Sequence, residues 1–172
     1  MTTENPYKLT SDTLLDAART TLAAVVSLLL ARLLKLPEFY WVPISAIVII
    51  ESTIDPRTLA WQRFAGTALG ALLAALIATF FPSSAVVYAI AIFLCGVLCA
   101  LLRFRGAYRF AAITLSIILL IAHTSPAWIV ALHRFLEVSL GIAVALAIAE
   151  LWPQPRATTY AIQPPPTTRS SS

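Results

Sequence analysis

The chain has 172 residues, of which 59% are hydrophobic and 12% are charged, and its formal net charge is +4. An ordinary soluble domain carries roughly 25% charged residues, so this chain has too few of them to cover a surface in water. The composition excludes an ordinary soluble domain and indicates a protein that is solvated by a lipid bilayer.

Six apolar segments, separated by short polar or proline-containing turns, predict an all-α protein with six transmembrane helices. The segments cover residues 17–36, 41–54, 62–81, 85–102, 108–122 and 128–152. A helix needs about 20 apolar residues to cross the hydrocarbon core, so the second segment is short for a span.

These segments and their flanks predict three regions. Residues 1–16 are expected to be a polar cytoplasmic lead-in, and residues 17–153 one integral membrane domain. Residues 154–172 are rich in Pro, Thr and Ser. Such a segment buries too little apolar surface to fold, so we expect a disordered cytoplasmic tail.

The distribution of Lys and Arg predicts that both termini face the cytoplasm, because short cytoplasmic loops are enriched in these residues. With the N-terminus inside, nine basic residues fall in inside segments and three in outside segments. The nine are Lys8, Arg19, Arg57, Arg63, Arg103, Arg105, Arg109, Arg156 and Arg169, and the three are Arg32, Lys35 and Arg134. No loop contains more than three of them, which argues against a nucleic-acid-binding patch.

Several residues recur at a constant separation of 71 positions. Arg63-Phe64, Leu69-Gly70 and Pro82 return as Arg134-Phe135, Leu140-Gly141 and Pro153, and Tyr40-Trp41 has a looser counterpart in Tyr108-Arg109. Two halves of three spans insert in opposite directions, so residues 17–82 and 85–153 predict a 3+3 inverted repeat, a common arrangement in secondary transporters. Chance recurrence of Arg-Phe before an apolar helix is the alternative.

Small residues follow one another at four-residue spacing in the third and sixth segments. They are Gly66, Gly70, Ala74 and Ala78 in the third segment, and Ser139, Ala143 and Ala147 in the sixth, where Gly141 repeats Gly70. Such faces let helix backbones approach closely, so we expect these two helices at the centre of the bundle.

Four charged residues lie inside or beside the spans, namely Arg63, Arg134, Glu51 and Glu137. A charge at the membrane centre costs roughly 2.5–3.5 kcal/mol, so such residues usually face a partner or a wet cavity. Arg134 and Glu137 are three residues apart and are expected to pair on one helix face. We expect Glu51 to pair with Arg63 or Arg57 across the short loop.

Two interpretations of these charges stay open. In the functional one, the arginines attract an organic anion and a carboxylate exchanges protons with it, while Tyr40, Trp41, Phe64 and Phe135 offer aromatic faces. In the structural one, the charged groups are interfacial anchors that reach the lipid headgroups. The sequence contains no phosphate-binding loop, nucleophile motif or metal-ligand motif, so we expect neither an enzyme nor a metal site.

Two stretches resemble the fusaric acid resistance (FUSC) or aromatic acid exporter family. They are Leu36-Pro37-Glu38-Phe39-Tyr40-Trp41-Val42-Pro43-Ile44-Ser45-Ala46-Ile47-Val48 and Gln62-Arg63-Phe64-Ala65-Gly66-Thr67-Ala68-Leu69-Gly70. Arg19-Thr20-Thr21-Leu22-Ala23 and Arg134-Phe135-Leu136-Glu137, with Gly141 and Pro153, fit as well, so the likeness covers residues 17–153.

The resemblance implies a bacterial inner-membrane transporter that exports aromatic carboxylates or related organic anions, coupled to the proton gradient and without a prosthetic group. Members of this family are often larger and carry a second membrane block, so we expect a homo-oligomer or a partner membrane subunit. A non-transporting subunit or scaffold that assists a larger efflux system is the alternative, because small-residue faces suit assembly as well as transport.

We expect a reporter fused after Ser83 to lie outside the cytoplasm, because the segment around Ser83 contains no Lys or Arg. Alkaline phosphatase, which is active only outside the cytoplasm, measures this position, and the same fusion after Arg105 is the inside control. An inactive reporter after Ser83 would overturn the orientation.

Overall fold

The computed structural model describes residues 11–82, 84–121 and 126–152, which form six α-helices and one short 3-10 helix. The helices are α1 (Ser11–Leu33), α2 (Trp41–Ile50), α3 (Pro56–Phe80), α4 (Ala85–Leu101), η1 (Arg105–Ala107), α5 (Tyr108–Ile121) and α6 (Ala127–Leu151). The predicted all-α class is confirmed. The predicted tail over residues 154–172 and residues 1–10 of the predicted lead-in lie outside the described residues.

Three helices are long and apolar enough to cross a membrane, which makes this a multi-pass protein. They are α1 over Leu14–Leu33, α3 and α6. The other three, α2, α4 and α5, are apolar but have only 10, 17 and 14 residues. At a rise of 1.5 Å per residue, α2 extends over about 15 Å, half of the hydrocarbon thickness.

Helix α3 begins six residues before the predicted start at residue 62, and a local capping signal explains the difference. The Asp55 side chain accepts a hydrogen bond from the Thr58 backbone N–H at 3.0 Å, and Pro56 occupies the first turn. Both features stabilise a helix N-terminus. This cap therefore fixes where the α2–α3 connection ends and how far Arg63 lies from the start of α3.

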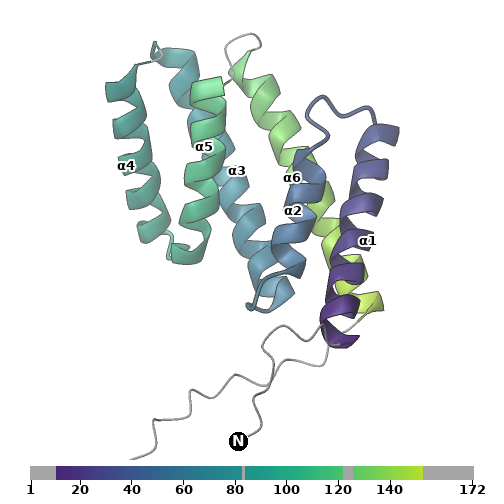
Figure 1. Cartoon of the computed structure of the whole chain (residues 1–172). Coiled ribbons are helices and arrows are strands. Elements are labelled where there is room, and N and C mark those ends of the chain that lie inside the picture. Colours follow the sequence, from purple (N-terminus) through teal and green to yellow (C-terminus); the bar gives the residue numbers. More distant parts are fainter. Residues whose placement is uncertain (1–10, 83, 122–125, 153–172) are drawn as a thin grey trace, which may run out of the picture.

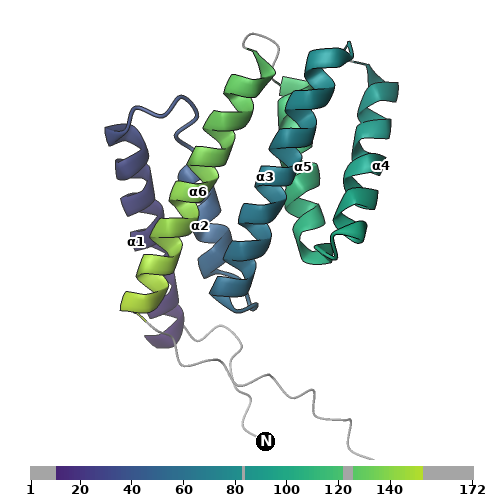
Figure 2. The same cartoon turned by 180° about the vertical axis from the view of Figure 1, so that it is seen from behind.

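Helices α3 and α6 run antiparallel through the middle of the bundle, as Figures 1 and 2 show from opposite sides. Helix α5 packs on α3 with α4 outside it, and α2 packs on α6 with α1 outside it. The predicted central position of the third and sixth helices is confirmed. The α2–α3 and α4–α5 connections lie at the lower end in Figure 1, together with the start of α1 and the end of α6.

Glycines bring the two short helices close to the two central ones. An added Cβ at Gly66 or Gly70 would lie within 3.0 Å of a backbone carbonyl oxygen at the α5 side, that of Ala107 or Ala111. An added Cβ at Gly141 would lie within 3.0 Å of the Val42 carbonyl oxygen on α2. These positions on α3 and α6 therefore admit the neighbouring backbones only because a side chain is absent.

The buried face of α6 differs from the small-residue stripe that the sequence predicted. Ala143 and Ala147 are exposed, whereas Gly141, Ala145 and Ile148 are buried. Small residues at four-residue spacing occur on two faces of this helix, and Gly141 selects the one that meets α2. On α3, Ala74 is fully buried, in agreement with a packing role, whereas Ala78 at the end of the predicted stripe is exposed.

We expect Gly70→Ala to lower the thermal unfolding midpoint of the purified protein, because the new Cβ would press on backbone atoms of Ala111. Overpacking of this kind costs about 1–3 kcal/mol. Gly96→Ala is the matched control, since its Cβ would meet only the movable Tyr108 side chain at 3.3 Å. Equal midpoints for the two variants would contradict this account of the α3–α5 contact.

Candidate anion-binding site

Two arginines lie inside the bundle at matching depths from opposite ends. Arg63 on α3 and Arg134 on α6 each lie seven residues after the first residue of their helix, which is about 10 Å along the axis. Arg63 is 8% exposed and Arg134 is 2% exposed. A guanidinium in such a position needs neighbours that replace water, because unpaired buried charge is strongly unfavourable.

Each arginine stacks on an aromatic ring from the neighbouring short helix. The Arg134 guanidinium carbon lies 4.2 Å from the ring centre of Trp41 on α2. The Arg63 guanidinium carbon lies 5.0 Å from the ring centre of Phe110 on α5. The sequence had singled out Trp41 but missed Phe110, because the looser repeat aligned Trp41 with Arg109, one position out of step.

Arg134 belongs to an ionic cluster with two carboxylates. Its Nη2 donates to Glu38 Oε2, and its Nη1 lies 3.7 Å from Glu137 Oε2, so the predicted Arg134–Glu137 contact is present. The Glu38 backbone N–H donates to Glu137 Oε1 at 3.0 Å. The exposed Tyr40 donates its hydroxyl to Glu38 Oε2 at 3.3 Å, so Tyr40 is linked to Arg134 through Glu38.

The surroundings of Arg63 are different, because they contain a second cation. Its Nη2 donates to Ser45 Oγ at 3.0 Å, and no carboxylate among the described residues forms an ion pair with it. The Arg109 guanidinium stacks on the same Phe110 ring at 4.6 Å. Two guanidinium groups thus flank one ring, and no carboxylate among the described residues forms an ion pair with either. Such a site favours the binding of an anion.

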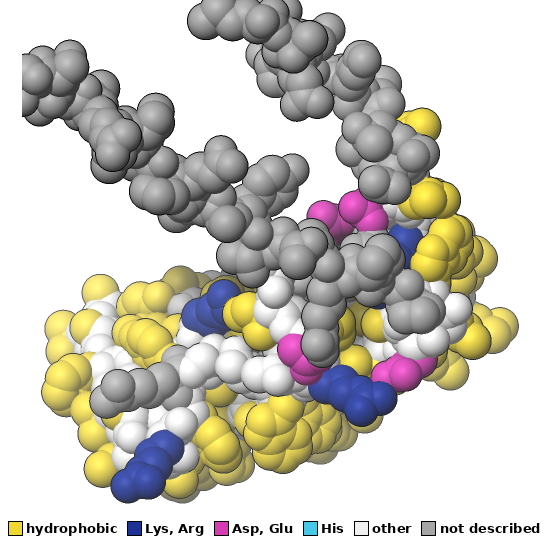
Figure 3. Space-filling view, turned by 90° about the horizontal axis from the view of Figure 1, so that it is seen from below, with side chains coloured by type: hydrophobic (Ala, Val, Ile, Leu, Met, Phe, Trp, Pro, Cys, Tyr) yellow, Lys and Arg dark blue, Asp and Glu magenta, His cyan; other side chains and the backbone are white. Residues whose placement is uncertain are grey.

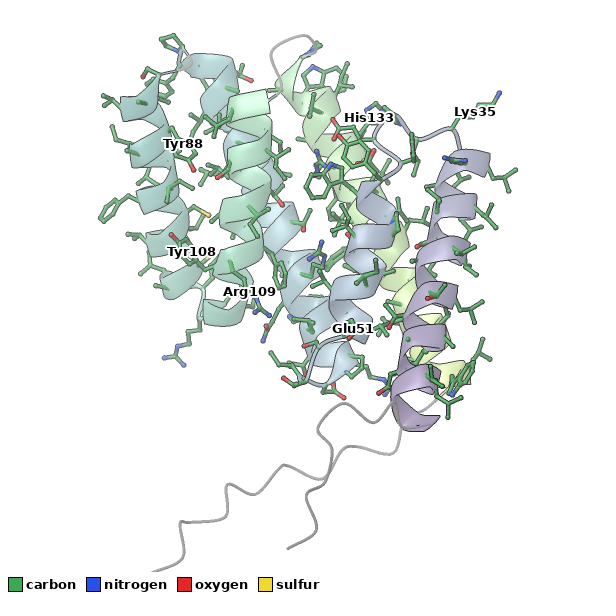
Figure 4. All side chains as sticks on the ribbon, in the orientation of Figure 1. Lys35, Glu51, Tyr88, Tyr108, Arg109 and His133 are labelled. Atoms are coloured by element: carbon green, nitrogen blue, oxygen red, sulfur yellow. The ribbon has the colours of Figure 1, made fainter. Side chains whose placement is uncertain are left out.

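Glu51 is not part of the site around Arg63 and Phe110, and its predicted pairing with Arg63 or Arg57 is wrong. The Glu51 carboxylate accepts a hydrogen bond from the Thr20 hydroxyl, and Arg57 pairs with Glu150, with Nε to Oε1 at 3.1 Å. Figure 4 places Glu51 at the lower end and His133, the neighbour of Arg134, at the upper end. The two candidate acids therefore lie at opposite ends of the bundle.

A polar cavity of about 700 Å3 opens at the lower end of the bundle. It lies between the start of α1, the α2–α3 connection and the end of α6, and its charged lining includes Asp16, Arg19, Glu51 and Glu150. Arg19 is 6% exposed, and its Nε has no hydrogen-bond partner among the described residues. Figure 3 shows acidic and basic side chains gathered at this end within a hydrophobic rim.

A second cavity, of about 550 Å3, lies near the upper end between the end of α3, the start of α4 and the end of α5. Its lining is mainly apolar and includes Phe81, Ile118 and Leu119. Tyr88, which points from α4 towards α5 in Figure 4, shares a hydrogen bond of 2.9 Å with Ser116 on α5. These two cavities near opposite ends therefore differ in their lining, since charged side chains line the lower one and mainly apolar side chains the upper one.

Residues 23–148 match the family model of fusaric acid resistance protein-like proteins. The match begins in α1 and ends in α6, and it includes both arginines and both stacked rings. The chain belongs to this family. The predicted resemblance is therefore confirmed, and the protein is a multi-pass member of a family of membrane transporters, a class that is generally not enzymatic. No curated protein and no solved structure matches the chain.

We expect Arg134→Gln to lower the free energy of unfolding by about 3–5 kcal/mol, because it leaves the fully buried Glu137 without its cation. Denaturation of the purified protein in mixed micelles measures this change. Glu150→Gln is the matched control, since it breaks an exposed pair with Arg57 and should leave unfolding unchanged. Equal stability of both variants would show that the Arg134 cluster is not a buried ion pair.

Proposed function

We propose that this protein exports aromatic carboxylates or related organic anions across the bacterial inner membrane. The observation that carries the proposal is the buried Arg63, which has no carboxylate partner among the described residues and shares the Phe110 ring with Arg109. A carboxylate ligand would supply the missing negative charge by charge-assisted hydrogen bonds. An aromatic ring on that ligand would suit the aromatic surroundings.

We place the intake of substrate at the polar cavity of the lower end. Helix α2 connects this cavity with the Arg63 site, because Ser45 contacts Arg63 and Ile50, near the end of the same helix, lines the cavity. Arg19 offers a first cation on this route. The lower end also carries the basic α4–α5 connection, so the distribution of Lys and Arg supports a cytoplasmic position for it and for both termini.

Matching contacts support the proposal that the two halves form an inverted repeat. Arg134 follows Arg63 at the offset of the repeat, and the ring of Phe110 follows that of Trp41 at an offset only two positions smaller. The glycine contacts obey the same two offsets, because Gly70 meets Ala111 and Gly141 meets Val42. A chance recurrence of Arg-Phe would not reproduce these contacts on two other helices.

The contact between Phe64 and Phe135 and the positions of the two cavities also support an inverted repeat. Phe64 and Phe135, which are equivalent in the repeat, contact each other with ring centres 5.0 Å apart, as residues near a two-fold axis would. Arg19 of the lower cavity corresponds to Tyr88 of the upper cavity at the smaller of the two offsets. We propose that the substrate path runs between these two cavities, where the halves meet.

Several finer features of the transporter remain part of the proposal. We assign proton exchange to Glu137, which is fully buried next to Arg134, rather than to the exposed Glu51. In the membrane the three shorter helices complete six crossings, with their ends extended by the polar connections. The subunits are proposed to act as a homo-oligomer or with a partner membrane subunit.

Arg63→Gln should abolish export while the protein stays in the membrane, with at least a tenfold loss of rate. The measurement is accumulation of a labelled hydroxybenzoate in exporter-deficient bacteria, with and without an uncoupler. Arg103→Gln is the matched control, because this exposed arginine lies in the α4–α5 connection at the lower end and lines neither of the two cavities. Export by Arg63→Gln at the rate of the control would refute the assignment.

A further inference from the structure

The two equivalent arginines have different acidic neighbours. Glu38 and Glu137 contact Arg134. At the two offsets of the repeat, Ala107 corresponds to Glu38 and Gly66 corresponds to Glu137 around Arg63. One arginine therefore already carries a carboxylate of the protein itself, whereas its counterpart does not.

Glu38 is placed to be exchanged for another carboxylate. It lies in the α1–α2 connection rather than in a helix, and its side chain is 32% exposed, whereas the Arg134 side chain beneath it is 2% exposed. Its backbone N–H holds Glu137, and its carboxylate holds Arg134 and the Tyr40 hydroxyl. The connection is thus fastened to α6 by one residue that covers Arg134 at the upper end.

We propose that Glu38 is the outer gate, and that the carboxylate of the exported anion takes its place on Arg134 before release. This inference rests on the proposed function and adds the second half of its path. Exchange of one carboxylate for another keeps the charge of the buried cluster constant, so Arg134 is never left unpaired. Trp41, already stacked on Arg134, presents an aromatic face to the incoming ring.

The exchange explains why the cluster has two acids for one arginine. Glu137 is fixed within α6 and stays with Arg134 while Glu38 moves away with its connection. Movement of Glu38 also breaks the hydrogen bond from its backbone N–H to Glu137. The Glu38 side chain and the α1–α2 connection therefore move away from α6 together. Towards the lower end, where Ala107 takes the place of Glu38, no carboxylate among the described residues pairs with Arg63, so the incoming anion has none to displace there.

The test is the reactivity of Arg134 towards phenylglyoxal in native membranes, followed by peptide mass analysis. Glu38→Ala and Glu38→Gln should raise the modification rate of Arg134 at least fivefold, and the exposed Arg103 in the α4–α5 connection serves as the internal reference. Tyr40→Phe, a change at an exposed residue, should give a smaller rise by loosening Glu38. Glu51→Gln is the matched control and should change nothing.

Benzoate supplies the second readout. In Glu38→Ala membranes, added benzoate should slow the modification of Arg134 several-fold, because it occupies the place of Glu38. Unchanged Arg134 reactivity in folded Glu38 variants overturns the gate, and faster modification without protection by benzoate overturns the exchange. Failure of the proposed function is separate, since it would appear as equal accumulation of labelled hydroxybenzoate in cells with and without this protein.

Discussion

Two guanidinium groups lie in the apolar interior of this bundle, and the structure around them replaces the water that they lack. Each such charge costs roughly 2.5–3.5 kcal/mol at the membrane centre unless neighbours compensate it. The compensation comes from the short helices, because α2 supplies Trp41 and Ser45 and α5 supplies Phe110. These groups come within reach only because Gly70 and Gly141 admit the backbones of α5 and α2.

In the proposed inverted repeat, the two arginines have matching aromatic and glycine contacts but different charged neighbours. At the upper end a carboxylate of the protein occupies Arg134, and at the lower end Arg63 shares its ring with Arg109. In the proposed mechanism an anion enters where positive charge is unbalanced and leaves where it has to displace Glu38. A scaffold protein would not need either buried arginine. The small-residue faces that suggested a scaffold include Gly66, Gly70 and Gly141, and these glycines pack against helices of the same subunit.

Much of this fold could be predicted from the sequence, because apolar segments, proline turns and isolated charges are local signals. The six helices, the central position of α3 and α6, and the contact of Arg134 with Glu137 followed from spacing alone. The start of α3 was missed because Asp55-Pro56 was interpreted as the end of the second segment and not as the cap of the next helix. The face of α6 was misplaced because its small residues fit two helical stripes.

The decisive residues of the site depend on contacts that spacing does not reveal. Glu38 is 96 residues from Arg134 in sequence and lies in a connection, where a carboxylate is ordinarily solvated. Phe110 and Ser45 carry no functional signal of their own, and they matter only because packing brings them to Arg63. The predicted pairing of Glu51 with an arginine was wrong although the residues are close in sequence. In the structure Glu51 accepts a hydrogen bond from Thr20, and Arg57 pairs with Glu150.

The central claim is that this protein moves an aromatic carboxylate between the two ends of the bundle. Exchange of labelled benzoate by liposomes that contain only the purified protein tests it most directly. The account predicts exchange that is saturable and accelerated by unlabelled benzoate on the opposite side. Exchange no faster than that of protein-free liposomes, with the protein folded in the bilayer, would contradict it.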